Sequence, residues 1–107
     1  MRLYGLRNCD TCRKAMKEIQ ATGVDITLID VRIDGVAHDD LARFHTAFGD
    51  ALLNTRSTTW RGLSEIERQL PALELLAAHP TLMKRPVIDG PNGLTLGWTK
   101  DIQAQYL

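Results

Sequence analysis

The chain has 107 residues, a length that fits one globular domain. Its 13 lysine and arginine residues balance 13 aspartate and glutamate residues, so the formal net charge is zero. This neutrality argues against direct binding of nucleic acid, and no apolar segment is long enough to span a membrane. Because the first residues lack the apolar core of a signal peptide, we expect a cytoplasmic protein that does not bind membranes.

The first third of the chain predicts a strand, a helix and a second strand. Residues 2–6 form an apolar run typical of a buried strand, and residues 7–10 are expected to form a loop. Apolar residues then recur at helical spacing over residues 12–19, with Asp10 as the predicted N-cap. Residues 26–31 are largely β-branched or apolar, which indicates a second strand. A unit of this kind predicts two parallel strands.

The middle of the chain predicts helices. The spacing of apolar residues over 41–48 indicates a helix that ends at Gly49. The hydroxyl-rich residues 52–60 are expected to form an ordered loop. Two short helices are predicted at residues 64–70 and 71–78, with a proline in the first turn of the second.

The last quarter returns to strands. Residues 87–89 and 94–96 predict an antiparallel hairpin around the turn at residues 90–93. Apolar residues at Trp98, Ile102 and Tyr106 then predict a terminal helix. Without its helical middle, this order of elements is that of an α/β protein with a thioredoxin-like fold and a mixed four-stranded sheet.

A single Cys-x-x-Cys motif contains the only cysteines, Cys9 and Cys12. One bridge between near neighbours cannot serve as a disulfide scaffold. A zinc site would need two further ligands, and the spacings of His38, His45 and His79 do not fit a zinc finger. We therefore expect no metal and no bound cofactor, and interpret the motif as a redox site where a strand meets a helix.

We predict that Cys9 is the nucleophile and Cys12 the resolving thiol. A cysteine directly before a helix faces backbone N–H groups and the positive end of the helix dipole, which favour the reactive thiolate. Cys12 lies one turn later, within reach of Cys9. The negative charge of Asp10 opposes this effect unless its side chain points away. The alternative is two structural thiols with no redox role.

Two arginines are weaker candidates. Arg56 lies among hydroxyl side chains, a mixture suited to binding an oxyanion or a carboxylate. Arg85 precedes Pro86 at the start of a predicted strand, where a proline can be cis. The alternative for both arginines is a solvated charge in a surface turn.

Four segments carry a family resemblance, and they are YGLRNCDTCRKA at residues 4–15, LLNTRSTTW at 52–60, MKRPVI at 83–88 and LGW at 96–98. In this order they resemble the arsenate reductase-like family of the thioredoxin-like superfamily. The resemblance is closest to the YffB and Spx branch and spans nearly the whole chain. It implies a single domain over residues 1–107, with a thioredoxin-like core at 1–35 and 83–107 and a helical insertion at 36–82.

The resemblance also implies roles for individual residues. Cys9 matches the family's nucleophile, Arg85 an arginine that binds the substrate oxyanion, and Pro86 a cis-proline that faces the cysteine. Arg56 lies where the family has another active-site arginine, and glutathione is the family's thiol partner. The predicted substrate-binding residues are Asn8, Thr11, Arg56, Arg85 and Pro86.

The chain departs from true arsenate reductases in two places. Those enzymes carry a third arginine after the second hairpin strand, where this chain has Leu96, Gly97 and Trp98. Loss of one cationic group would weaken arsenate binding by about 1–3 kcal/mol. Glutathione-dependent arsenate reductases also have no cysteine at the position of Cys12, whereas Spx regulators do. Both departures weigh against arsenate as the substrate.

Three functions follow from these observations. The first is a glutathione-dependent thiol–disulfide oxidoreductase, acting on a small thiol or disulfide as a monomer, with glutaredoxin as a further partner. The second is an Spx-type regulator, in which the Cys9–Cys12 pair is a redox switch that alters binding to RNA polymerase. The third is a true arsenate reductase.

Overall fold

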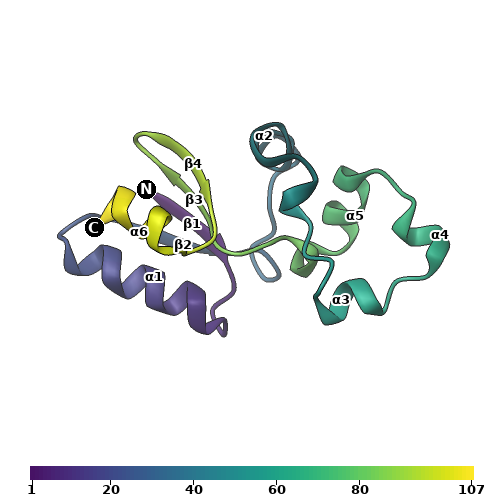
Figure 1. Ribbon diagram of the computed structural model, residues 1–107, viewed down its shortest axis with the longest axis horizontal. Coiled ribbons are helices and arrows are strands. Elements are labelled where there is room, and N and C mark those ends of the chain that lie inside the picture. Colours follow the sequence, from purple (N-terminus) through teal and green to yellow (C-terminus); the bar gives the residue numbers. More distant parts are fainter. The chain divides into compact units, whose positions relative to one another are not determined.

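The computed structural model describes residues 1–107, the whole chain, which forms two compact units. We call the first, Met1–Asp34 with Arg85–Leu107, the sheet unit and the second, Gly35–Lys84, the helical unit (Figure 1). The helical unit is slightly longer at both ends than the insertion expected at residues 36–82.

A mixed four-stranded sheet with strand order β2-β1-β3-β4 forms the centre of the sheet unit. The strands are β1 (Arg2–Gly5), β2 (Thr27–Asp30), β3 (Val87–Gly90) and β4 (Gly93–Leu96). β1 pairs in parallel with β2 and antiparallel with β3, and β4 pairs antiparallel with β3. The α/β class and the mixed sheet predicted from the sequence are therefore confirmed.

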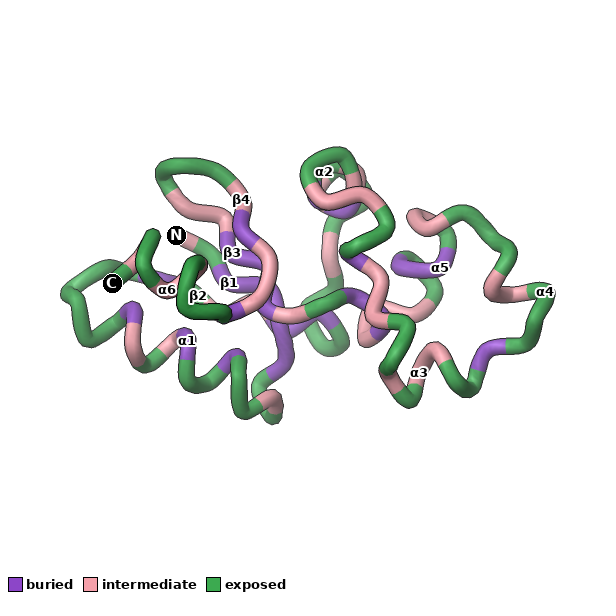
Figure 2. The backbone as a smooth tube through the Cα atoms, in the orientation of Figure 1, coloured by how far each residue is buried: buried purple, intermediate pink, exposed green.

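Two helices, α1 (Asp10–Ala21) and α6 (Lys100–Tyr106), pack against one face of this sheet. The strand register aligns Leu28, Leu3, Ile88 and Thr95 in a row across the four strands, and residues in register share a face. Figure 2 shows the buried residues of α1 on the side of the helix that faces the strands. The core between these layers contains Leu3, Cys12, Ala15, Ile19, Ile26, Ile88 and Trp98.

The helical unit is made of short elements. They are α2 (His38–Phe48), a 3₁₀ turn (Gly49–Leu52), α3 (Thr58–Arg61), α4 (Glu65–Arg68), α5 (Ala72–Ala78) and a second 3₁₀ turn (Pro80–Leu82). α2 packs against α5 and against the first 3₁₀ turn. No helix of the chain combines the length and the apolar character needed to cross a membrane.

Two expectations for this middle region are wrong in detail. The segment 52–60 is not loop throughout, because the hydroxyl of Ser57 accepts the backbone N–H of Trp60 at 3.1 Å and so begins α3. Pro71 is the N-cap of α5 and not a residue of its first turn. The first error arises from the Ser57 cap, and the second is a difference of one residue in where the helix begins.

Candidate active site around Cys9

Four strand ends meet at one edge of the sheet. β1 and β2 are parallel and both end there, at Gly5 and Asp30. β3 runs antiparallel to β1 and begins at that edge, so Arg85 and Pro86 precede it there. β4 ends at the same edge. The backbone N–H of Gly97, which follows β4, donates to the carbonyl of Pro86 at 2.8 Å. The loop that carries Cys9 leaves β1 at this edge.

Cys9 is the N-cap of α1. The prediction that Asp10 caps the helix is wrong, since Asp10 is the first helical residue and its carboxylate pairs with the Arg13 guanidinium at 2.9 Å. The Asp10 side chain is 96% exposed, so its charge is turned into solvent. The Cys9 sulfur consequently lies at the helix N-terminus, where unpaired backbone N–H groups and the helix dipole favour a thiolate.

The surroundings of the half-buried Cys9 sulfur favour its ionised form. Burial by itself raises the pKa of Cys9. Hydrogen bonds from the backbone N–H and the thiol of Cys12, together with a hydrogen bond from Arg85 and its positive charge, outweigh burial and lower this pKa below the ordinary 9.0. A thiolate that solvent can reach is the reactive form of cysteine.

Cys12 has the opposite character. It is fully buried in the core, and both cysteines are free thiols. Burial is the main cause that raises the pKa of Cys12 to about 12, and the neighbouring Cys9 adds to this effect. Cys12 therefore stays protonated and donates to the Cys9 sulfur. Cys9 is thus the more exposed and Cys12 the buried thiol, as expected, and their roles as nucleophile and resolving thiol stay predictions.

The other predicted site residues are distributed between the two units. Pro86 is buried, and the peptide bond between Arg85 and Pro86 is cis. Asn8 and Thr11 are exposed in the loop and the first turn around Cys9. The structure thus brings these residues together with the cysteines in the sheet unit. Arg56 belongs to the helical unit and is exposed, so its role in substrate binding stays a prediction.

Two residues at this edge of the sheet belong to the site but were not predicted from the sequence. Gly5 leaves room for the Cys12 sulfur, and the buried Asp30 accepts a backbone N–H from the Cys9 loop. The signal for Gly5 was a glycine within an otherwise apolar strand, which often marks close approach of another group. The sequence feature that could have indicated Asp30 is an acidic residue at the end of a predicted strand.

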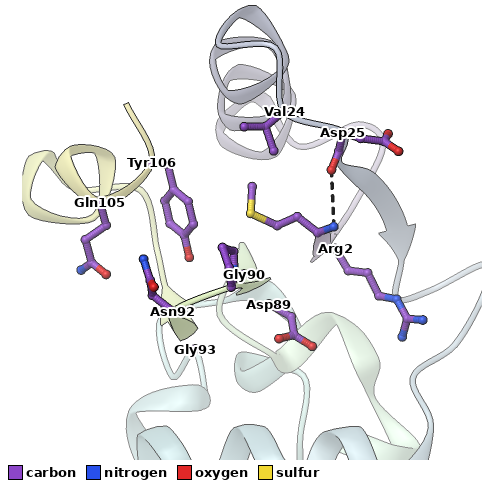
Figure 3. A pocket seen from close by; sticks show the side chains of 11 residues that line it. Arg2, Val24, Asp25, Asp89, Gly90, Asn92, Gly93, Gln105 and Tyr106 are labelled. Atoms are coloured by element: carbon purple, nitrogen blue, oxygen red, sulfur yellow. Dashed lines mark hydrogen bonds between the residues drawn. The ribbon is translucent and has the colours of Figure 1, made fainter.

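A pocket of the sheet unit lies at the opposite ends of the strands. Its volume is about 610 Å³, and Figure 3 shows its lining by the start of β1, the turn between β3 and β4, and the end of α6. In it the amino group of Met1 donates to the carbonyl of Asp25 at 3.4 Å. Because Cys9 is not among its lining residues, this pocket is not part of the cysteine site.

The chain is similar to known proteins over almost its whole length. A model described as the ArsC family matches residues 4–105. An uncharacterised protein of Haemophilus influenzae is 41% identical, covering 97% of this chain and 96% of its own. The global transcriptional regulator Spx 2 of Bacillus anthracis is 24% identical, covering 98% of this chain and 85% of its own.

Solved structures give the same result. A protein named YffB aligns with a TM-score of 0.87 and 31% identity, over 99% of this chain and 97% of its own. An arsenate reductase (ArsC) related protein from Brucella melitensis aligns with a TM-score of 0.73 and 34% identity, over 98% and 92%. These matches confirm the thioredoxin-like fold and the relationship that the four sequence segments indicated.

Proposed function

The chain belongs to the ArsC family, and on this premise we propose that it is a thiol–disulfide oxidoreductase that uses glutathione. The observation that carries the proposal is the pair of unlike thiols at one helix N-terminus. Cys9 is accessible and has a lowered pKa, whereas Cys12 is buried beside it with a raised pKa. This pairing fits one cysteine that attacks a disulfide and one that is protected from solvent.

The first step is attack by the Cys9 thiolate on one sulfur of a substrate disulfide. The substrate S–S bond breaks, a bond forms between Cys9 and that sulfur, and the other half leaves as a thiolate that takes a proton from solvent. The guanidinium of Arg85, which contacts the Cys9 sulfur, is placed to stabilise negative charge on sulfur during the exchange.

The second step resolves the mixed disulfide. The Cys12 thiol gives up its proton as its sulfur attacks that of Cys9. The bond between Cys9 and the substrate sulfur breaks, the Cys9–Cys12 disulfide forms, and the second half of the substrate takes up a proton and leaves as a thiol. Once Cys9 is covalently bound it carries no charge, so its contribution to the raised pKa of Cys12 disappears. Two glutathione molecules then reduce the protein disulfide and leave as glutathione disulfide. In the alternative route, a glutathione thiolate attacks the Cys9 sulfur and the second half of the substrate leaves as a thiol. A second glutathione then attacks the bound glutathione sulfur, which releases Cys9 and glutathione disulfide without using Cys12.

The test is the reaction of the reduced protein with glutathione disulfide, followed by intact mass. We expect a single glutathione adduct on Cys12→Ser, no adduct on Cys9→Ser, and an internal disulfide in the wild type. If none of the three proteins gains an adduct and the wild type closes its disulfide only with peroxide, glutathione has no part in the mechanism.

A second function is supported by the similarity to Spx and by the hydrogen bond between the two thiols. In it, the Cys9–Cys12 pair is a redox switch that controls binding to RNA polymerase. Capture of the polymerase by only one redox state of the wild type, and by neither state of Cys9→Ser, would favour this function. Arsenate reduction, the third function, is tested by turnover with glutathione and glutaredoxin.

A further inference from the structure

Asp30 is the one charged side chain that is fully buried, with 1% of its surface exposed. A buried carboxylate is costly unless hydrogen bonds replace its hydration. Asp30 accepts three backbone N–H groups, and its two oxygens serve different segments. Oδ1 accepts from Arg32 at 2.9 Å and from Ile33 at 3.0 Å, which closes the turn after β2. Oδ2 accepts the backbone N–H of Arg7 at 3.0 Å, and Arg7 lies in the loop that carries Cys9.

The bond to Arg7 determines how one peptide plane is oriented. The N–H of Arg7 and the carbonyl of Leu6 belong to the same planar peptide group and point in opposite directions. On one side this group donates to Asp30. On the other, the Leu6 carbonyl accepts the backbone N–H of Cys9 at 3.2 Å. Asp30 is therefore linked to the backbone of Cys9 through a single rigid group.

We propose that Asp30 is a positioning residue, which holds the Leu6–Arg7 peptide so that the Cys9 sulfur stays between its hydrogen-bond donors. The proposal rests on the function proposed above, because it concerns the reactivity of Cys9. The negative charge of Asp30 also polarises the peptide group and strengthens the Leu6 carbonyl as an acceptor. Asp30 acts through the loop and does not touch the substrate.

Asp30→Asn isolates this effect. The amide oxygen can keep the two N–H groups of the turn after β2, while the NH₂ group then faces the N–H of Arg7, so only the bond to the Cys9 loop is lost. The matched control is Asp34→Asn. It removes a carboxylate from the same turn, where Asp34 Oδ2 accepts the N–H of Asp30 at 2.9 Å, but leaves the bond to Arg7 intact.

The readout is the rate of alkylation of Cys9 by iodoacetamide as a function of pH, with intact mass to count adducts. We expect Asp30→Asn to raise the pKa of Cys9, so that alkylation near pH 6 slows by about threefold to tenfold, the equivalent of one hydrogen bond. Loss of a negative charge alone would act in the opposite direction. Asp34→Asn should resemble the wild type.

The outcomes separate the two proposals. If wild-type Cys9 shows no lowered pKa, the proposed oxidoreductase loses its basis. If wild-type Cys9 is reactive but Asp30→Asn, with an intact fold, has an equal or lower pKa, the positioning role is wrong. If Asp30→Asn does not fold, the positioning role is tested on the wild type by following the NMR chemical shifts of its backbone amides during an acid titration. The Arg7 and Cys9 amides should move in the same step as those of Arg32 and Ile33, and a Cys9 amide that does not move would contradict the proposal.

Discussion

The sulfur of Cys12 occupies the space in which a side chain on Gly5 would lie. A β-carbon built on Gly5 would overlap Sγ of Cys12 and approach its Cβ to 3.2 Å. Because Gly5 has no side chain, α1 can place the buried thiol of Cys12 directly against β1. This close packing holds Cys12 beside Cys9 and away from solvent.

Gly5→Ala should destabilise the sheet unit and disturb the cysteine pair. The added methyl group forces Cys12 or the strand to move, and overpacking of this kind costs about 1–3 kcal/mol in the free energy of unfolding. Denaturant unfolding measures this loss. Gly62→Ala is the control, because a β-carbon there meets its nearest atoms at 3.5 Å and 3.6 Å, an ordinary contact. Equal stabilities of the two variants would contradict the role of Gly5.

Arg85→Ala should make Cys9 less reactive. The guanidinium donates a hydrogen bond to the Cys9 sulfur and adds a positive charge beside it, and both lower the pKa of Cys9. We expect the pKa to rise and alkylation near pH 6 to slow by about threefold to tenfold. Lys84→Ala, which removes an exposed neighbouring charge, is the control. A similar slowing in both variants would indicate a general effect of charge.

The Cys12 thiol should also contribute to the pKa of Cys9. Cys12→Ser retains a hydrogen-bond donor, whereas Cys12→Ala removes it. The alkylation profile of Cys9 should therefore be displaced to higher pH in the alanine variant than in the serine variant, with a rate difference of about twofold to tenfold near pH 6. Coinciding profiles would show that the backbone N–H of Cys12 and Arg85 suffice.

Asp30 should stabilise the fold in a pH-dependent way. Burial by itself raises its pKa, but the N–H groups of Arg7, Ile33 and Arg32 and the charge of Arg32 outweigh this and lower it below the ordinary 3.8. A carboxyl whose pKa is lowered on folding stabilises the native state above its unfolded pKa. This contribution is lost as the pH falls through the lower, folded pKa.

The Asp30→Asn variant tests this dependence. Near pH 7 it should be less stable than the wild type by about 1–3 kcal/mol, the cost of an unsatisfied buried donor. The difference should shrink below about pH 4. Denaturant unfolding across this range measures it. A difference that is independent of pH would show that the charge of Asp30 contributes nothing.

The local chemistry of the chain was sufficient to predict its strands, most of its helices and the position of its cysteine pair at the start of a helix. The alternation of apolar residues, the turn residues between β3 and β4 and the spacing of Cys9 and Cys12 involve neighbours a few positions apart. Such local patterns can be recognised from the sequence alone. Even so, the N-cap of α1 was misplaced by one residue, since the Cys9 carbonyl accepts the backbone N–H of Arg13 and Asp10 is already helical.

Only the tertiary structure decided which groups surround the cysteines. The bond from Arg7 to Asp30 joins residues 23 positions apart, and Arg85 reaches Cys9 from the other end of the chain. Both contacts exist because β2 and β3 flank β1 and present their ends at the same edge. The ionisation of a thiol depends on the donors within a few ångströms of it, and strand pairing and core packing select those donors.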